Sequence, residues 1–375
     1  MIRIAYFIDH LRIGGAQKHL VELLRGLDRR RFAASVWTEK SGGELTAEIE
    51  GLGIRVRSLD VQRSLTEGRS LVRLAQVAYA LRREGVHIVH GYLYAGNLVG
   101  SVAGLLSKVP VRIVSKRSLD SYRSWPKLLA CRLSNRLADR VTVNARAVGQ
   151  FVEREEGCAP GKMVVIPNGV DCSRLQCSDT GAREALGLSP GELVVGTVGR
   201  LTWKKAPECL LAAAQIFLQE EPRVRLLVVG DGPLRAQVEK QAEELGIHGR
   251  CIFTGGVSDA SPFIHACDVF VLSSVIEGMA NALLEALASG KPAVVTDAGG
   301  NSEVVQHGKT GFVVPRNTPS QLAQATLHLL RHPELAVQMG ELARKDMEAR
   351  FSLPRMVQSV ETLYETLLRE KGIRL

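Results

Sequence analysis

Two glutamates in one otherwise apolar segment are the clearest candidates for chemistry in this chain. The segment SSVIEGMANALLEALASGKPAVVTD spans residues 273–297, and Glu277 and Glu285 lie eight positions apart within it. On one continuous helix this spacing would place them about 80° apart around the axis, off a common face. A strand, a loop and then a helix fit better, with Glu277 after the strand and Glu285 one turn into the helix. The alternative is that both are solvated helix residues.

The residues between the two glutamates are suited to holding an anion. The N–H groups of a helix's first turn lack intrahelical partners and attract negative charge, and Asn281 is a plausible N-cap. Small side chains would let a ligand approach this backbone. We therefore expect a phosphate here, with one carboxylate facing a sugar and the other a ribose diol. The candidate contact residues are Gly278, Met279, Ala280, Asn281 and Ala282.

Two cations could bind the same anion. In GTVGRLTWKKAPECL, Arg200 follows a predicted strand and Lys205 precedes a predicted helix. Such a pair can neutralise a diphosphate, although both could equally be ordinary surface cations. The stretch VVGDGPLR lacks the third glycine of a dinucleotide-binding motif, so it is more typical of a tight turn with Pro233 opening a helix.

The bulk composition is that of a globular protein. The chain has 375 residues, of which 45% are hydrophobic and 23% charged, enough for two domains with real cores. The net charge of +9 points to phosphates, nucleic acid or an anionic membrane surface. Aromatic residues make up only 5%, which disfavours an aromatic platform for single-stranded nucleic acid, so no nucleic-acid partner is expected.

Much of the excess positive charge lies in residues 112–140, which contain eight lysines and arginines but only two aspartates. From about Pro126 the pattern is helical, with leucines at helical spacing. We interpret this stretch as a surface for anionic lipid or for a lipid-diphosphate acceptor. The alternative is an ordinary packed amphipathic helix. The residues of this predicted membrane patch are Arg123, Trp125, Lys127, Arg132, Arg136 and Arg140.

Cysteine and acidic-residue patterns argue against several kinds of site. Seven scattered cysteines without a C-x-x-C pair disfavour a disulfide framework or a zinc site and fit a reducing cytoplasm. The sequence contains no Asp-x-Asp and no tight cluster of Asp, Glu and His, so neither a metal nor another cofactor is expected. MIRIAYFID leads directly into a predicted strand and no apolar run reaches ~18 residues, so we expect neither a signal peptide nor a transmembrane helix.

Strand and helix patterns alternate along the chain, which predicts an α/β fold with parallel sheets. The candidate strands are IRIAYFID, FAASVWTE, IRVRSLD, HIVHGY, VRIVSK, RVTVNA and MVVIPN, then LVVGTVGR, VRLLVVGD, CIFTGG, VFVLSS, PAVVTD and GFVVP. Helical patterns include 71–83, 97–107, 206–219, 233–245 and 281–289, and after Pro315 only 319–331, 333–350 and 353–370.

Turn-forming residues cluster at 167–181 and mark a domain break near residue 170. We therefore predict two doubly wound, Rossmann-like domains, 1–170 and 171–350. A C-terminal helix within 351–375 is expected to pack back on the first domain. Because such sheets bind ligands at the carboxyl ends of their strands, a cleft faced by both domains is the expected site.

Several motifs in this order resemble one family over nearly the whole chain. They are LRIGGAQKHL, VVIPNGVD, VGRLTWKKAPECLL, LLVVGDGP, VFVLSSVIEGMANALLEALASGKPAVVTDAGGNSEVV and GKTGFVVP. Together they are similar to the retaining nucleotide-sugar glycosyltransferases of family 4, which have the GT-B fold. The resemblance implies an acceptor-binding first domain and a donor-binding second domain.

The resemblance also implies roles for individual residues. Arg200 and Lys205 match the family's diphosphate-binding Arg and Lys, and Glu277 and Glu285 match its pair of glutamates, the first facing the donor sugar and the second the ribose hydroxyls. Gly15 matches the glycine loop that approaches the diphosphate from the first domain, where the absence of a Cβ allows backbone contact. A simple strand-to-helix turn is the alternative for Gly15.

The chain departs from the family pattern in two places. The loop EGMANA replaces the usual Glu-Gly-Phe-Gly-Leu-Pro, which leaves the backbone donors in place. Lys116 and Arg117 stand where many relatives have a histidine, so we expect them to contact a phosphate or an anionic acceptor instead. His90, which we place at a strand end, is the remaining histidine that could contact the acceptor, unless it is a satisfied core residue.

The expected function is retaining, metal-independent transfer of a hexose or N-acetylhexosamine from a UDP-sugar to a glycan or lipid-linked acceptor. We expect this in cell-surface polysaccharide or glycolipid synthesis, at the inner face of the cytoplasmic membrane. The alternatives are a nucleotide-sugar epimerase on the same fold and a membrane-binding homologue without activity.

Overall fold

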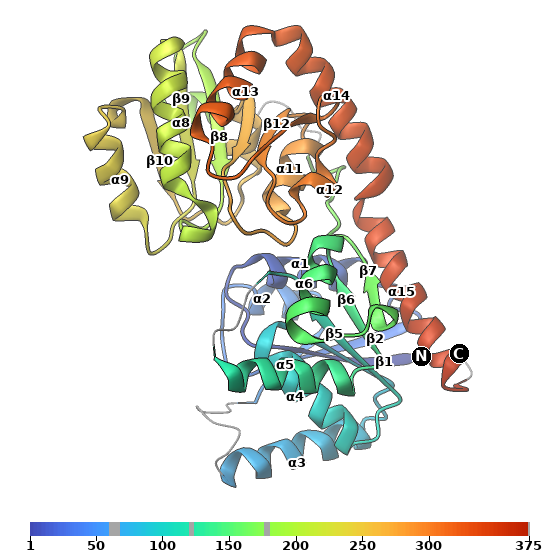
Figure 1. Cartoon of the computed structure of the whole chain (residues 1–375). Helices are drawn as coiled ribbons and strands as arrows, with labels where there is room; N and C mark the ends of the chain where they lie inside the picture. Colours follow the sequence, from blue (N-terminus) through green and yellow to red (C-terminus); the bar gives the residue numbers. More distant parts are fainter. Residues whose placement is uncertain (60–67, 120–123, 176–180, 374–375) are drawn as a thin grey trace. The chain divides into compact units, whose positions relative to one another are not determined.

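The computed structural model describes residues 1–59, 68–119, 124–175 and 181–373, and the chain forms two compact units (Figure 1). Unit 1 comprises Met1–Gly169 and Leu353–Leu375, and unit 2 comprises Val170–Ser352. The domain boundaries predicted from the sequence follow residues 170 and 350, close to the boundaries between these units. Each unit has its own parallel sheet and its own core.

Unit 1 is built on a seven-stranded parallel sheet in the order β3-β2-β1-β4-β5-β6-β7. The order reverses between β1 and β4, so the carboxyl ends of these two strands form the switch point at which such sheets bind ligands. The strands are β1 Ile2–Ile8, β2 Phe32–Thr38, β3 Arg55–Ser58, β4 Ile88–Tyr92, β5 Val111–Lys116, β6 Arg140–Val143 and β7 Met163–Val165.

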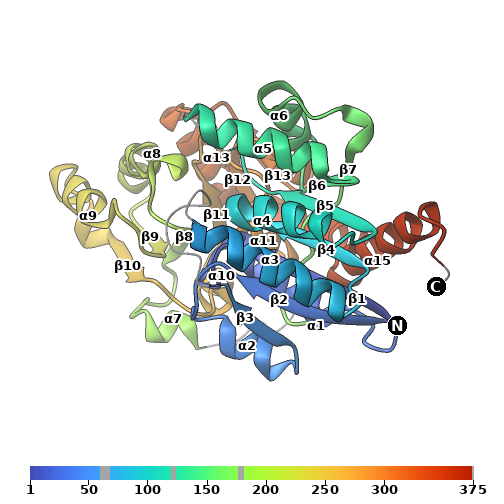
Figure 2. The ribbon, with the colours of Figure 1, turned by 90° about the horizontal axis from the view of Figure 1, so that it is seen from below.

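The two faces of this sheet carry different helices. Alternate side chains of β1 point to opposite faces. Ile4 and Tyr6 pack in a core with side chains of α1 and α15, whereas Ala5 and Phe7 pack with α3 and α4. Figure 2 shows α3, α4 and α5 side by side on one face of the sheet. The helices are α1 Gly15–Gly26, α2 Thr46–Gly51, α3 Gly68–Arg83, α4 Leu93–Leu106, α5 Trp125–Leu137, α6 Arg146–Glu156, the 3-10 helix η1 Pro160–Lys162, and α15 Leu353–Glu370.

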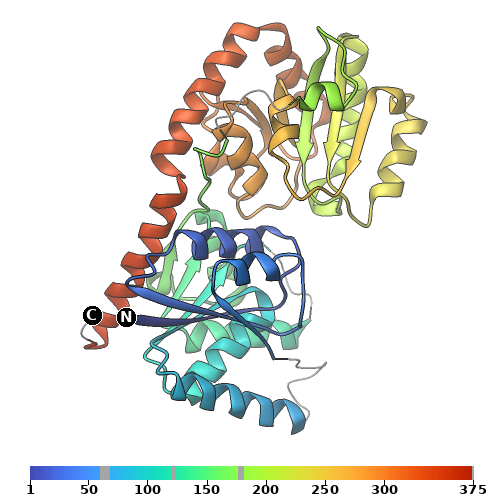
Figure 3. The ribbon, with the colours of Figure 1, turned by 180° about the vertical axis from the view of Figure 1, so that it is seen from behind.

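The last helix, α15, completes the core of unit 1. The hydroxyl of Tyr364 lies 3.0 Å from the hydroxyl of Tyr6 on β1. A Cβ at Gly26 of α1 would lie only 2.5 Å from Cγ2 of Val357, so the missing side chain lets α1 and α15 approach closely. Figure 3 shows α15, in red, beside the first strand.

Unit 2 is built on a six-stranded parallel sheet in the order β10-β9-β8-β11-β12-β13, and its order reverses between β8 and β11. The strands are β8 Leu193–Val198, β9 Val224–Val229, β10 Cys251–Gly255, β11 Val269–Leu272, β12 Ala293–Thr296 and β13 Gly311–Val314. The helices are α7 Ala182–Ala185, η2 Trp203–Lys205, α8 Pro207–Glu220, α9 Arg235–Glu244, η3 His248–Arg250, α10 Ser261–Ala266, α11 Asn281–Ala288, α12 Asn301–Val304, α13 Pro319–Arg331 and α14 Pro333–Arg350.

The predicted fold class is confirmed, because both sheets are parallel and each has the strand order of a doubly wound domain. Each predicted strand segment contains a strand of one of the two sheets. Within the described ranges, every helix is too short or too polar to cross a bilayer.

Candidate functional site

Arg200 lies at the carboxyl end of β8, in a segment that the next strand holds in place. The backbone N–H of Gly199 donates to the carbonyl of Val229, and that of Leu201 donates to the carbonyl of Asp231, both at 2.9 Å. Gly232 makes this approach possible, since a Cβ there would lie 2.4 Å from the Leu201 carbonyl oxygen. The GDG stretch therefore supports the segment that presents the exposed Arg200 side chain.

Lys205 is positioned by an unusual backbone turn. Lys205 is the last residue of the 3-10 helix η2. The next residue, Ala206, has a φ of 45°, a left-handed backbone conformation that residues other than glycine rarely adopt. The Ser273 hydroxyl, just after β11, donates to the carbonyls of Lys205 and Ala206 at 2.8 and 3.0 Å. These two bonds fasten η2 to the carboxyl end of β11 and help to hold the strained turn.

Two partners hold the side chain of Glu277 in place. Lys205 Nζ forms an ion pair with Glu277 Oε1, and the Ser274 hydroxyl donates to the same oxygen at 2.8 Å. The side chains of Lys205 and Glu277 are 27% and 11% exposed, so the pair is only partly accessible. The buried Thr296 hydroxyl donates to the Ser274 carbonyl at 2.5 Å, which fixes the loop that carries Glu277.

Glu285 lies one turn into α11, as predicted, and is half-buried. The helix begins at Asn281, and Ala280 is its N-cap residue rather than Asn281, which corrects the sequence assignment. The Ala280 carbonyl accepts the N–H groups of Leu283 and Leu284. The amides before these two form the turn at which a helix attracts anions.

The loop before α11 is partly buried, in keeping with its apolar and small residues. Met279 and Ala280 are both buried, and the Gly278 carbonyl accepts the N–H of Gly300 at 2.9 Å. Asn281 and Ala282 are half-buried. The fixed loop sets the direction of the first turn of α11.

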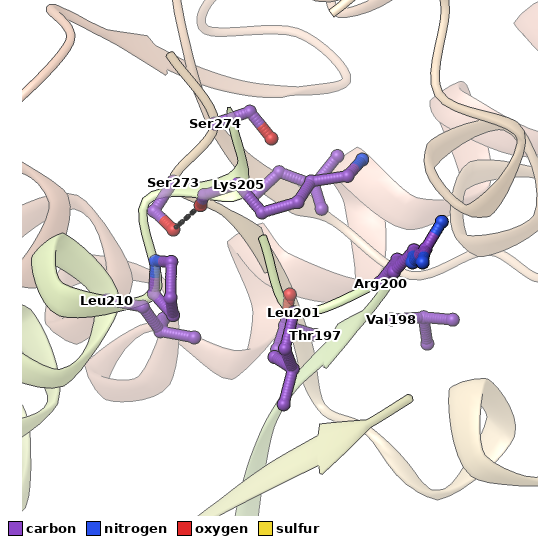
Figure 4. Close-up of a pocket in the computed structure, with 11 residues that line it drawn as sticks. Thr197, Val198, Arg200, Leu201, Lys205, Leu210, Ser273 and Ser274 are labelled. Atoms are coloured by element: carbon purple, nitrogen blue, oxygen red, sulfur yellow. Dashed lines mark hydrogen bonds between the residues drawn. The ribbon is translucent and has the colours of Figure 1, made fainter. Parts of the chain in front are cut away.

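Arg200 and Lys205 line one pocket at the carboxyl ends of β8 and β11, and Figure 4 shows their side chains extending in the same direction. Ser273 and Ser274 line it as well. The structure therefore brings together Arg200, Lys205 and, through the ion pair, Glu277. Two cations beside a carboxylate can hold a diphosphate next to a hydroxyl-bearing group. Our sequence reasoning missed Ser273, Ser274 and Thr296, since a lone hydroxyl residue carries no spacing signal.

Gly15 belongs to unit 1, where it is the first residue of α1 and is exposed. The residue before it, Gly14, has extended backbone with φ −173°, so this junction needs no left-handed residue. Contact between Gly15 and a diphosphate stays a prediction.

His90 is a core residue, which corrects the expectation that it contacts an acceptor. It lies in the middle of β4 and is 1% exposed. Nδ1 is 2.6 Å from the Tyr364 hydroxyl and Nε2 is 2.8 Å from the Ser115 hydroxyl, so both ring nitrogens are occupied. Burial, with the charge of Arg117 adding to it, lowers the pKa of His90 to about 3, so the ring is neutral.

Lys116 also has a structural role, which corrects its assignment as an acceptor contact. It is buried at the end of β5, and its ammonium group lies 2.7 Å from Glu156 Oε2. Arg117 is half-buried, donates to Asn168 Oδ1 and stands 6.0 Å from the ring centroid of Tyr92. Burial lowers the pKa of Arg117 to about 10. Contact between Arg117 and an anionic acceptor stays a prediction.

Only some residues of the predicted membrane patch lie together on one helix. Arg140 begins β6 and pairs with Glu370 at 3.2 Å, so it does not extend the basic helix. Arg123 lies outside the described residues. The remaining patch residues, Trp125, Lys127, Arg132 and Arg136, are exposed on α5.

No group of three or more His, Cys, Asp or Glu side chains that could hold a metal ion is found in the described ranges. None of the described cysteines is in a disulfide bond, and burial raises the pKa of Cys267 to about 12.

Comparison with known proteins gives a consistent result. A family model described as Glycosyltransferase Family 4 matches residues 13–174, and one described as Glycosyl transferases group 1 matches residues 179–346. The D-inositol 3-phosphate glycosyltransferase of Streptomyces scabiei is 27% identical, over 90% of this chain and 83% of its own length. The Escherichia coli UDP-Gal:alpha-D-GlcNAc-diphosphoundecaprenol alpha-1,3-galactosyltransferase is 25% identical, over 99% of this chain and 98% of its own.

A solved structure shows the same fold. The crystal structure of Anabaena HepE in complex with UDP and glucose superposes with a TM-score of 0.86, at 24% identity, over 97% of this chain and 99% of that one. Since the two family models match consecutive parts of the chain that together cover most of both units, the chain belongs to the group 1 and family 4 glycosyltransferases and is a glycosyltransferase of GT-B fold.

Proposed function

We propose that this glycosyltransferase moves a hexose or N-acetylhexosamine from a UDP-sugar to a glycan or lipid-linked acceptor, with retention of configuration and without a metal ion. Unit 2 binds the donor and unit 1 the acceptor. The reaction serves cell-surface polysaccharide or glycolipid synthesis at the inner face of the cytoplasmic membrane.

The observation that carries this proposal is the Lys205–Glu277 ion pair beside Arg200 in the pocket of unit 2. The cations are suited to the diphosphate, and the carboxylate, oriented by Ser274, is suited to a sugar hydroxyl. Glu285, one turn into α11, is suited to the ribose diol.

Several names of relatives support the choice of donor and acceptor. HepE has been crystallised with UDP-glucose, and the Escherichia coli relative is named for UDP-Gal and for an acceptor carrying a diphosphoundecaprenol lipid. Another relative is named as a Vi polysaccharide biosynthesis protein of Salmonella typhi. These names favour a uridine nucleotide and an acceptor that is a glycan or is attached to a lipid.

The charges that the chain itself supplies support the proposal of metal independence. As the bond to the sugar breaks, negative charge develops on the leaving diphosphate. Arg200, Lys205 and the first turn of α11 can stabilise that charge. In the proposed retaining reaction, the acceptor hydroxyl attacks from the face that the diphosphate leaves. A phosphate oxygen takes the hydroxyl proton, so no residue of the chain needs to act as the base.

The first test is binding, followed by turnover. A thermal-shift screen against nucleotide sugars identifies the donor, and release of UDP is then measured with candidate acceptors, with and without EDTA. We expect release to depend on the acceptor, to be unchanged by EDTA and to fall at least tenfold in Glu285→Ala. Glu244→Ala on α9, which removes an exposed carboxylate, is the matched control.

Three outcomes would contradict the proposal. Chelation that abolishes turnover would refute metal independence. Conversion of the donor without any acceptor would identify an epimerase. Full activity in Glu285→Ala would refute the predicted contact between Glu285 and the ribose.

A further inference from the structure

Three neighbouring helices of unit 1 carry no acidic residue. Helices α3, α4 and α5 contain no Asp or Glu, whereas α1, α2, α6 and α15 of the same unit each contain at least one Glu. Helix α4 packs against both α3 and α5, so the three form one layer on one face of the sheet (Figure 2). The cations of this layer therefore have no acidic partner within their own helices.

The outward side of α5 combines apolar and cationic side chains in one stripe. Trp125, Leu129 and Leu133 are 72%, 49% and 45% exposed and follow one another at intervals of four residues. Arg132 and Arg136 are exposed between and beyond them, and these five positions fall within about 100° of the helix surface. The opposite side, with Cys131, Ser134 and Asn135, is buried.

The other two helices extend the same pattern. On α3, Leu71, Val72 and Tyr79 are exposed together with Arg82 and Arg83, and at the end of α4, Leu105 and Leu106 are exposed beside Lys108. Among the described residues, eight of the fourteen large apolar side chains that are exposed lie on these three helices. Exposed apolar side chains gathered on one layer mark a binding surface.

We propose that the outer surface of α3, α4 and α5 binds a membrane that contains anionic lipid. Aromatic and aliphatic side chains enter the boundary between headgroups and acyl chains, while arginines at the same level bind lipid phosphates. Because these three helices carry no carboxylates, their side chains do not repel the negative charge of an anionic membrane. A nucleic acid would use the cations but not the leucines, and a dimer interface would bring like charges together. This inference deepens the proposed function, since it names the surface and the lipid class of the peripheral association.

Binding is measured by co-sedimentation with phosphatidylcholine vesicles, with and without phosphatidylglycerol. We expect the wild-type chain to sediment with the phosphatidylglycerol vesicles. Arg132→Gln with Arg136→Gln should partition about 30-fold more weakly, because each basic residue at an anionic surface contributes roughly 1 kcal/mol. Arg344→Gln with Lys345→Gln, which removes the same charge from exposed positions on α14, should bind as the wild type does.

Tryptophan fluorescence tests the apolar part of the surface. Insertion of Trp125 should shift the emission to shorter wavelength when vesicles are added. The shift should vanish in Trp125→Phe and persist in Trp203→Phe, since Trp203 is also exposed but lies in unit 2. Leu129→Gln with Leu133→Gln should lose vesicle binding while its far-ultraviolet circular dichroism stays unchanged.

Several other outcomes would contradict the proposed membrane surface. Equal binding by the two double-arginine variants, a wild type that ignores phosphatidylglycerol, or self-association or DNA binding that depends on this surface would overturn the proposal. UDP binding, measured on the same variants by thermal shift, separates this inference from the proposed function. Variants that bind UDP normally but show no lipid effect refute only the surface, and a wild type that binds lipid but no UDP refutes only the donor assignment.

Discussion

The ion pair between Lys205 and Glu277 makes a prediction that a simple list of binding residues would not. Without a ligand, the cation that is expected to bind the diphosphate is already paired with a carboxylate. A bound diphosphate must therefore compete with Glu277 for Lys205 Nζ, and the carboxylate also repels the phosphates directly. Glu277→Gln should free the lysine, so it should strengthen UDP binding while it weakens sugar transfer.

The magnitude follows from the surroundings of the pair. Two unit charges ~4 Å apart attract by about 4 kcal/mol at an effective dielectric constant of 20. The lysine is partly exposed, which screens this attraction, and a net value of about 1.5–3 kcal/mol is usual for a hydrogen bond to a charged group. Because the glutamine oxygen can still accept a bond from Lys205, we expect a gain of about 1–1.5 kcal/mol, or roughly tenfold tighter UDP.

Turnover should move in the opposite direction. If Glu277 accepts a hydrogen bond from a sugar hydroxyl in the transition state, replacing its charge with a neutral amide should lower kcat by about 100-fold, the lower end of what removal of one preorganised electrostatic contact costs. The Ser274 hydroxyl can donate to the glutamine oxygen as it does to the carboxylate, so the loop should keep its conformation.

Isothermal titration of UDP into four proteins provides the assay. The proteins are the wild type, Glu277→Gln, Lys205→Met and Lys240→Met, the last removing an exposed charge from α9 as a control. Lys205→Met should weaken UDP binding at least tenfold, and Lys240→Met should leave it unchanged. Weaker UDP binding in Glu277→Gln together with normal binding in Lys205→Met would refute the competition argument.

Two further predictions concern buried hydrogen bonds. Ser274→Ala should lower kcat about tenfold with little change in UDP affinity, because the lost bond orients Glu277 and does not touch the diphosphate; equal losses in both would contradict this role. Since the folded-state pKa of His90, about 3, lies below its ordinary 6.5, its contribution to stability is present above pH 6.5 and is lost as the pH falls toward 3. Urea unfolding of unit 1, followed by circular dichroism, should lose about 2 kcal/mol more between pH 7 and pH 5 in the wild type than in His90→Gln, and identical pH dependence would refute the assignment.

The strands could be predicted because both faces of each parallel sheet are covered. Runs such as RLLVVG are apolar without alternation, and turn residues mark their ends. The long C-terminal helices α13, α14 and α15 were predicted with the bounds that are observed, since each has a proline at its first or second position and spans several turns. Short helices such as α7 and α12, of four residues each, were not predicted, because one turn shows no helical periodicity.

The residues that we propose for the donor site could be named individually from the sequence, but their contacts with one another could not. Lys205 and Glu277 are 72 positions apart, and no local pattern indicates that they form an ion pair. The assignment of His90 was wrong for a related reason. The sequence places it near the end of an apolar run, but β4 continues to Tyr92, and its hydroxyl partner Tyr364 comes from a helix 274 residues later in the chain.

The basic segment at 112–140 shows why counting charges locates a surface only approximately. Arg112, Lys116 and Arg140 have acidic partners at Asp139, Glu156 and Glu370, two of which lie outside the segment, so the local excess of charge is smaller than the sequence indicates. Arg132 and Arg136, by contrast, are exposed on α5, a helix without acidic residues. The distribution of carboxylates, rather than the number of arginines, is therefore the basis on which we propose a face for an anionic membrane. It also explains why α3, which lies outside the segment, belongs to that face.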